Sequence, residues 1–171
     1  PVRRANWGAF GSRSVSAQLP FGAHTSRRRA ARLTGPVAVV VTIGGILAAT
    51  ALSPTFAWDT SALSDLGVTA GTASLFNGSL VAGGIVGLPY AWALWSAASD
   101  PLSHFRAASY LFALAAMAGV GLAPAGALLH VPFALSFFLF AALTAVVDGI
   151  ARFRLTSGKL SLLTGVVAPA A

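Results

Sequence analysis

The chain has little of what a soluble or secreted protein needs. Its 171 residues include no cysteine, which excludes a disulfide framework, a thiolate metal site and a cysteine nucleophile. Charged residues make up only 9% of the chain and hydrophobic residues 56%, whereas a soluble domain has about 25% charged residues. Because so few charges cannot cover a soluble surface, the composition predicts an integral membrane protein.

Common catalytic and nucleotide-binding motifs are also missing. The sequence contains no GxSxG, HExxH or P-loop pattern. The net charge of +7 does not indicate nucleic-acid binding, because the basic residues gather near the N-terminus or flank apolar runs. Seven of the eleven lie in the first 32 positions: Arg3, Arg4, Arg13, Arg27, Arg28, Arg29 and Arg32. We therefore expect the lipid bilayer as the partner of this chain, with no nucleic acid and no cofactor.

Four apolar runs approach the length of about 20 residues that a transmembrane helix needs. They are residues 34–52, 74–95, 105–122 and 130–150, and a shorter run at 160–171 is a partial fifth. The predicted fold class is all-α: a polytopic transmembrane helix bundle with four complete spans and a truncated fifth. Residues 34–171 form this transmembrane domain.

Residues 1–33 precede the first span and contain no acidic residue. Their richness in Arg, Ser, Gly and Ala predicts a disordered, basic, cytoplasmic arm. Two origins fit this composition: an organellar transit peptide, or translated sequence upstream of the true start. The chain opens with Pro1 and its last apolar run is short, so we expect a doubtful start and a truncated end.

The distribution of basic residues among the loops sets the predicted orientation. Basic residues lie before the first span, beside the 96–104 loop and in the 151–159 loop. The 53–73 and 123–129 loops have none. By the positive-inside rule the N-terminus is cytoplasmic and these two loops face outward. We expect a multi-pass protein of the cell membrane.

One acidic residue falls at the inner end of a predicted span. Asp148 lies in the last turn of the fourth span, shortly before Arg152 and Arg154. The expected role is that of an interfacial acid paired with one of these neighbouring bases. Arg106 is expected only as the inner anchor of the third span.

Polar side chains gather at the predicted outer face. The 53–73 loop holds two of the four acidic residues and no Lys or Arg. Chain direction alone predicts one polar cluster there, formed by Asp59, Ser61, Ser64, Asp65, Asn77 and His130. A carboxylate beside an imidazole can orient it, share a proton or help to hold a metal. One histidine and one or two aspartates are too few for a zinc site, so no metal is predicted.

Members of this cluster also have structural interpretations. Ser61 and Asp65 can cap a short helix, because their oxygens accept bonds from free N–H groups. Asp59 fits an Asx-turn after Trp58. His130 can bond a loop carbonyl at the membrane interface. Both interpretations stay open from the sequence alone.

Small residues line the centres of the first two spans. Gly44 and Gly45 lie in the first span, and Gly83 and Gly84 lie in the second. Such faces let helices approach closely, within one chain or between copies. A homo-oligomer held through these glycine-rich helix faces is therefore one expectation.

The outer loop carries a family resemblance. Residues 53–67, SPTFAWDTSALSDLG, follow the pattern S-P-x-[FY]-[SA]-W-x-x-[NS]-A-[LI]-S-D-[LM]-G of the DUF998 family of prokaryotic membrane proteins. Phe76 and Asn77 match the Phe-Asn pair that opens the family's second span, and His130 matches the histidine that opens its fourth. The resemblance covers roughly residues 35–165 and implies a helical membrane protein, usually with more spans. The family's activity is unassigned, so no reaction is implied.

This chain departs from the family at one position between the third and fourth spans. Family members tend to have an acidic residue after a proline there, whereas Ala125 follows Pro124 in this sequence. The departure removes a third acidic ligand from the predicted outer cluster.

The sequence favours a non-enzymatic role, in which the outer polar cluster binds a lipid headgroup, a small solute or a partner. The reason is a polar loop without bases and without a complete catalytic set. One alternative is a metal-assisted membrane hydrolase using Asp65 and His130, with Ser64 or Asn77 in support. Another is a small-solute transporter, although no span has a charge at its centre, where ion pathways usually place one.

Overall fold

The computed structural model describes residues 21–167, and its regular structure is helical throughout, without a strand in that range. The elements in chain order are α1 (Phe21–Leu52), the short 3₁₀ helix η1 (Leu63–Gly67), α2 (Ala73–Ala97), α3 (Pro101–Leu122), α4 (His130–Ala151) and α5 (Thr156–Val167). The predicted all-α class is therefore confirmed.

Four of these helices are long and apolar enough to cross a membrane: Arg29–Leu52, Ala73–Ala97, Pro101–Leu122 and His130–Ala151. They coincide with the four predicted complete spans, apart from shifts of a few residues at their ends. The shorter α5 begins just before the predicted partial fifth span. Length and composition thus make the chain an integral membrane protein.

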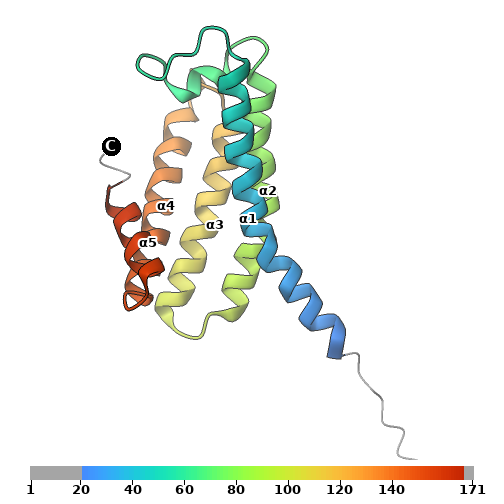
Figure 1. Ribbon diagram of the computed structural model, residues 1–171, viewed down its shortest axis with the longest axis vertical. Helices are drawn as coiled ribbons and strands as arrows, with labels where there is room; N and C mark the ends of the chain where they lie inside the picture. Colours follow the sequence, from blue (N-terminus) through green and yellow to red (C-terminus); the bar gives the residue numbers. More distant parts are fainter. Residues whose placement is uncertain (1–20, 168–171) are drawn as a thin grey trace, which may run out of the picture.

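The first helix starts earlier than the sequence predicts. Residues 21–33 were expected to belong to a disordered arm, but α1 already begins at Phe21 and continues past Pro36. Ala and Arg are strong helix formers, so the polar segment extends the helix of the span instead of ending it. In Figure 1 the first turns of α1 project beyond the other helices. The rest of the expected arm, residues 1–20, lies outside the described residues.

The helices alternate in direction, so the connections fall at two ends (Figure 1). The loop end holds the 53–72 connection, which includes η1, and the 123–129 connection. The basic end holds the α2–α3 and α4–α5 connections and the start of the α1 span. It gathers the basic residues Arg29, Arg32, Arg106, Arg152, Arg154 and Lys159.

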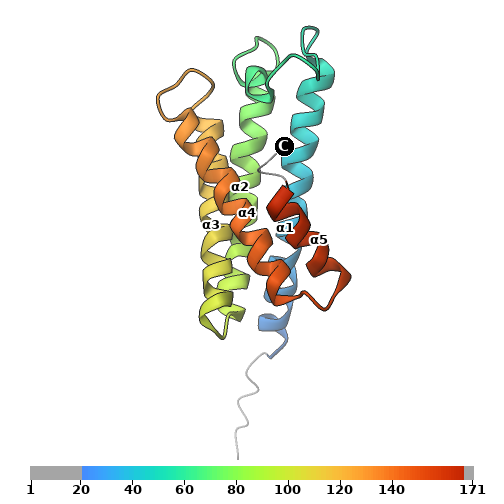
Figure 2. The same ribbon diagram turned by 90° about the vertical axis from the view of Figure 1, so that its left-hand side faces the viewer.

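Each helix packs against its neighbours in the chain, so that α1, α2, α3, α4 and α5 form a row. Helices α1 and α4 make no extensive contact with each other. Figures 1 and 2 together show that the row is curved, with α3 on one side and α1 and α5 on the other. The concave side of the row therefore lies between α1 and α4.

Close contacts inside the chain use the glycines of the second span. A Cβ atom on Gly83 would meet the Thr42 hydroxyl and, at 3.2 Å, the Ala38 carbonyl oxygen of α1. A Cβ atom on Gly84 would lie 2.9 Å from the Leu114 carbonyl oxygen of α3. These glycines thus let α2 lie tightly between α1 and α3. Gly45, Gly83 and Gly84 of the glycine-rich faces expected for a homo-oligomer thus pack against helices of the same chain, whereas a Cβ atom on Gly44 would meet no atom within 4 Å.

Candidate functional site

The 53–72 loop covers the loop end of the bundle and is held by its own polar residues. Asp65 Oδ2 accepts a hydrogen bond of 2.9 Å from the backbone N–H of Ala62, at the start of η1. The Asp65 carbonyl oxygen accepts another, of 2.7 Å, from the Thr69 hydroxyl. The predicted capping role of Asp65 is therefore confirmed. The same carboxylate reaches solvent, because Asp65 is exposed.

Asn77 ties the loop to α2. Its side-chain amide donates a hydrogen bond of 2.8 Å to the carbonyl oxygen of Gly67. The neighbouring Leu66 is only 1% exposed and inserts into the core cluster that includes Phe76. The Leu66 carbonyl oxygen accepts a bond of 3.0 Å from the buried Thr72 hydroxyl. The residues of the SDLG and Phe-Asn motifs thus have a structural task, which is to seat the loop on the bundle.

The other predicted loop residues do not converge. Ser61 Oγ accepts a hydrogen bond of 3.1 Å from the backbone N–H of Ala57. Asp59 is exposed, and neither it nor Ser64 makes a side-chain hydrogen bond within residues 21–167. The expected Asx-turn at Asp59 is therefore not formed by its side chain.

His130 opens α4 at the same end of the bundle. Its Nδ1 atom lies 2.7 Å from the Ala123 carbonyl oxygen, the loop-carbonyl bond of the structural interpretation. No hydrogen bond joins His130 to Asp65 in the described chain, and no group of three or more His, Cys, Asp or Glu is placed to hold a metal in that range. A shared binding site at the loop end stays a prediction.

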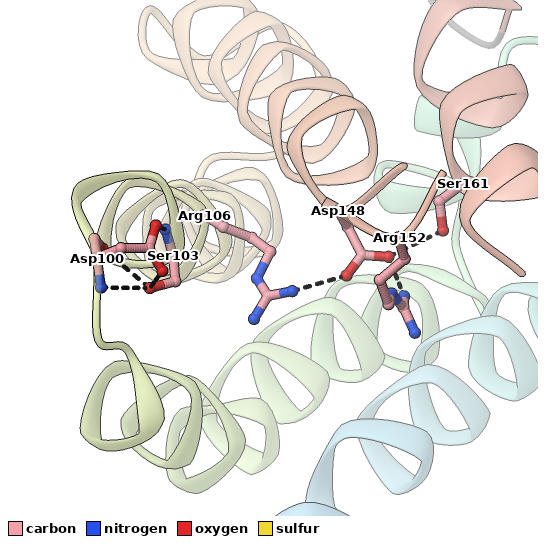
Figure 3. A network of polar contacts seen from close by, with 6 residues as sticks. All are labelled: Asp100, Ser103, Arg106, Asp148, Arg152 and Ser161. Carbon is pink, nitrogen blue, oxygen red and sulfur yellow. Dashed lines mark hydrogen bonds and ion pairs between the residues drawn. The ribbon is translucent and has the colours of Figure 1, made fainter. Parts of the chain in front are cut away.

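The most connected polar group lies at the opposite, basic end (Figure 3). Asp148 Oδ1 forms an ion pair of 2.9 Å with Arg106 Nη1 of α3. Its Oδ2 atom pairs with Arg152 and accepts a hydrogen bond of 3.1 Å from the Ser161 hydroxyl of α5. The predicted pairing with Arg152 is confirmed. One carboxylate therefore joins α3, α4 and α5.

Sequence reasoning missed the part played by Arg106. It was expected only as an anchor, because its partner is 42 positions away in the chain. The available signal was its place inside the third apolar run, where a charge usually has a partner or a function. The N-terminal cap of α3 determines where this helix begins. Because α3 begins at Pro101, Arg106 falls in its second turn.

Asp100 provides that cap, outside the span and on the basic end. Its Oδ1 atom accepts a hydrogen bond of 3.0 Å from the Ser103 backbone N–H, and its Oδ2 atom accepts one of 2.8 Å from the Ser103 hydroxyl (Figure 3). The bond from the Ser103 N–H is the main cause that lowers the pKa of Asp100 below its ordinary value of 3.8. The carboxylate thus caps α3 in its charged form.

A cavity of about 440 Å³ lies on the concave side of the helix row. This volume falls within the range of about 300–1,000 Å³ typical of ligand pockets. Most of the wall is apolar and comes from α1, α3 and α4, for example Ala38, Ile43, Leu114, Met117, Phe137 and Ala141. The polar lining is concentrated toward the basic end, with Arg106, Asp148, Arg152 and Ser161.

The cavity is elongated and open toward the lipid side. From Arg106 to Met117 the lining follows α3 for about 16 Å at a rise of ~1.5 Å per residue. Val39 and Ile43 line the cavity from α1 and are still 59% and 50% exposed. Helices α1 and α4 make no extensive contact with each other, so packing does not join these two walls of the cavity.

Helix row, charged cluster and cavity together define the class: a multi-span α-helical membrane protein with an amphipathic cavity between its helices. A comparison of the chain with models of known protein families, with curated proteins and with solved structures found no match.

Proposed function

We propose that this protein binds an amphiphilic small molecule in the cavity between α1, α3 and α4, without transforming it. The single observation that supports this function is the shape and polarity of the cavity. Its apolar walls continue into a charged group at the level where the helices end. A molecule with an apolar tail and a polar head matches this gradient, because each part meets groups of its own kind.

Binding fits the cavity better than catalysis. A general acid or base is most often an imidazole or a carboxylate that is free to exchange a proton with the substrate. Asp148 is the one carboxylate in the lining, and it is held by Arg106, Arg152 and Ser161. The lining contains no histidine or cysteine. These features support a non-enzymatic protein.

The functions suggested for the loop end have less support than binding in the cavity. Binding of a headgroup or solute by the outer cluster needs free polar groups, whereas Ser61, Asn77 and His130 already bond the backbone. A metal-assisted hydrolase needs Asp65 and His130 to share a ligand, and no contact supports this. Ion and proton pathways usually place a charge near the middle of a span, whereas Arg106 and Asp148 lie near helix ends.

Family and location belong to the same proposal. Membership of DUF998 is supported by the SPTFAWDTSALSDLG segment, by Phe76-Asn77 and by His130. A cytoplasmic N-terminus in the cell membrane is supported by the positive-inside rule, since the described basic residues share the basic end. The charged end of the cavity then faces the cytoplasmic leaflet.

The test is a cavity-filling substitution with a matched control on the same helix. Ala141 lines the cavity, whereas Leu139 is 56% exposed and lies outside the lining. Amphiphile retained by each purified variant is measured by native mass spectrometry from detergent micelles. Ala141→Trp should lose the bound molecule, and Leu139→Trp should keep it.

Two results would speak against the proposal. Equal retention in both variants would show that the bound molecules lie on the outer surface. Absence of any bound amphiphile, together with efficient crosslinking between copies through a cysteine placed at Phe137, would make the cavity a contact between chains instead.

A further inference from the structure

We propose that the molecule bound in the cavity carries an acidic headgroup, and that Arg106 and Arg152 bind its oxygens. This inference rests on the proposed amphiphile-binding function and names the class of ligand. The shared chemistry is an anionic carboxylate or phosphate group, attached to an apolar tail.

Arg106 has donors to spare. A guanidinium group carries five N–H donors in a planar fork, which suits carboxylate and phosphate oxygens. Only the bond from Nη1 to Asp148 is formed within residues 21–167. The Nε atom is buried there without a partner, a rare and unfavourable state for a polar group. Figure 3 shows the fork directed away from its own helix, with one arm toward Asp148.

The charge balance of the cluster favours an anion. Asp148 supplies one negative charge, and Arg106 and Arg152 supply two positive charges. The carboxylate is shared between both arginines and also accepts a bond from Ser161, so both of its oxygens are engaged. One more anionic group would neutralise the cluster. A cationic headgroup would meet two arginines and find no free carboxylate.

Two tyrosines extend the polar end. Tyr90 and Tyr110 line the cavity one beside the other, with ring centroids 5.4 Å apart in an edge-to-face arrangement. Neither hydroxyl group is hydrogen-bonded to the described chain, so both are available to a headgroup. Beyond them the lining is apolar up to Met117, apart from hydroxyl groups such as that of Thr42. This order of residues sets the head against Arg106 and the tail along α3 and α4.

The experiment compares four probes by titration calorimetry on the full chain in nonionic detergent. They are a fatty acid, a lysophosphatidic acid, a monoacylglycerol of the same tail length, and inorganic phosphate. The two acidic amphiphiles separate carboxylate from phosphate recognition. The neutral amphiphile tests the tail alone, and inorganic phosphate tests the anion alone.

The variants isolate Arg106 from the general positive charge of this end. Arg106→Gln should weaken binding of an acidic amphiphile by about tenfold or more. Arg154→Gln, an exposed arginine outside the lining, should change it by less than about twofold at moderate salt. Asp148→Asn should strengthen binding, because it frees Arg106 for the ligand. This opposite direction distinguishes recognition from a loss of folding.

Three other outcomes would contradict either the headgroup inference or the proposed amphiphile binding. If the monoacylglycerol binds as tightly as the acids and Arg106→Gln changes nothing, the headgroup inference is wrong while amphiphile binding stands. If inorganic phosphate alone binds as well as the amphiphiles, the cavity holds a free anion and the proposed function is wrong. If none of the four probes binds, both fail.

Discussion

Arg106 and Asp148 are 42 positions apart in the chain, and their side chains form an ion pair of 2.9 Å between α3 and α4. The pair stands at the charged end of the cavity, with 23% and 16% of the two side chains exposed. It joins two neighbouring helices that form adjacent parts of the cavity wall. The guanidinium of Arg106 lies in the cavity lining beside this carboxylate.

The ion pair should be visible as a coupling energy. We expect Arg106→Gln and Asp148→Asn each to destabilise the protein, and the double variant to be more stable than their sum by about 0.5–3 kcal/mol. The reason is that Asp148→Asn leaves the largely buried Arg106 without its counter-ion, whereas Arg106→Gln removes one of the two arginines that pair with Asp148. Denaturant unfolding in micelles measures the cycle, with Arg154→Gln as control. Strict additivity would mean that the pair contributes nothing.

The contact between Gly67 and Asn77, which holds the 53–72 loop on the bundle, predicts a steric clash that a second substitution relieves. A Cβ atom on Gly67 would lie 2.7 Å from Asn77 Oδ1, so Gly67→Ala should cost about 1–3 kcal/mol of unfolding free energy. In an Asn77→Ala background the clash is removed and the cost should be smaller. Thermal unfolding of the four proteins checks this. The same cost in both backgrounds would show that Asn77 does not pack on Gly67.

The glycines of α2 should differ sharply in their tolerance of a methyl group. Gly83→Ala places its Cβ against Thr42 and Ala38 of α1 and should cost about 1–3 kcal/mol. Gly78 has no atom within 4 Å of such a Cβ, so Gly78→Ala should leave stability unchanged or raise it by up to ~1 kcal/mol. Unfolding in micelles measures both.

The same pair of variants also tests association between copies. If Gly78→Ala instead weakens a dimer detected by crosslinking, Gly78 lies in a contact between chains. A loss of association only in Gly83→Ala would follow from damage to the fold of one chain.

The cap of α3 should respond to acid. The pKa of Asp100 is lowered in the folded protein, so its contribution to stability is complete above the ordinary value of 3.8 and is lost as the pH falls below it. Asp100→Asn keeps a hydrogen-bond acceptor that does not titrate. The stability difference between wild type and this variant should therefore shrink as the pH falls below the ordinary value of 3.8. A difference independent of pH would contradict the cap.

The orientation of the chain in the membrane can be tested with single cysteine substitutions. The chain has no cysteine of its own, so native residues give no background labelling. Thr60→Cys lies in the exposed 53–72 loop and Ser157→Cys at the basic end. In intact cells a membrane-impermeant maleimide should label the first variant and not the second, since the proposed orientation puts the basic end in the cytoplasm. After lysis both should react. The reverse pattern would place the N-terminus outside.

Composition and hydrophobic run length were enough to predict the helices. Each span is a local property of the sequence, and the bond between Asp148 and Arg152 is local as well, since both lie within one turn. The early start of α1 was missed because a polar segment rich in Ala and Arg reads equally as an arm or as a helix.

The cavity and the role of Arg106 could not be predicted from the sequence. Both depend on how the helices pack against one another. The apolar runs show where the helices are but not how they pack. The sequence has the same limit at the loop end. Chain direction predicted that Asp65 and His130 lie at the same end of the bundle. It could not show that Asp65 bonds the backbone of Ala62 and that His130 bonds the backbone of Ala123.

The most direct test of the central claim is photo-crosslinking of an acidic amphiphile whose reactive group sits at the end of its tail. Full-length protein in vesicles is irradiated and the labelled peptides are identified by mass spectrometry. The structure predicts adducts at the apolar end of the cavity, on Met117, Phe137 and Thr42. Arg106→Gln should reduce them. Adducts spread over lipid-facing residues such as Leu135 and Leu139, unchanged by Arg106→Gln, would contradict a ligand held in the cavity.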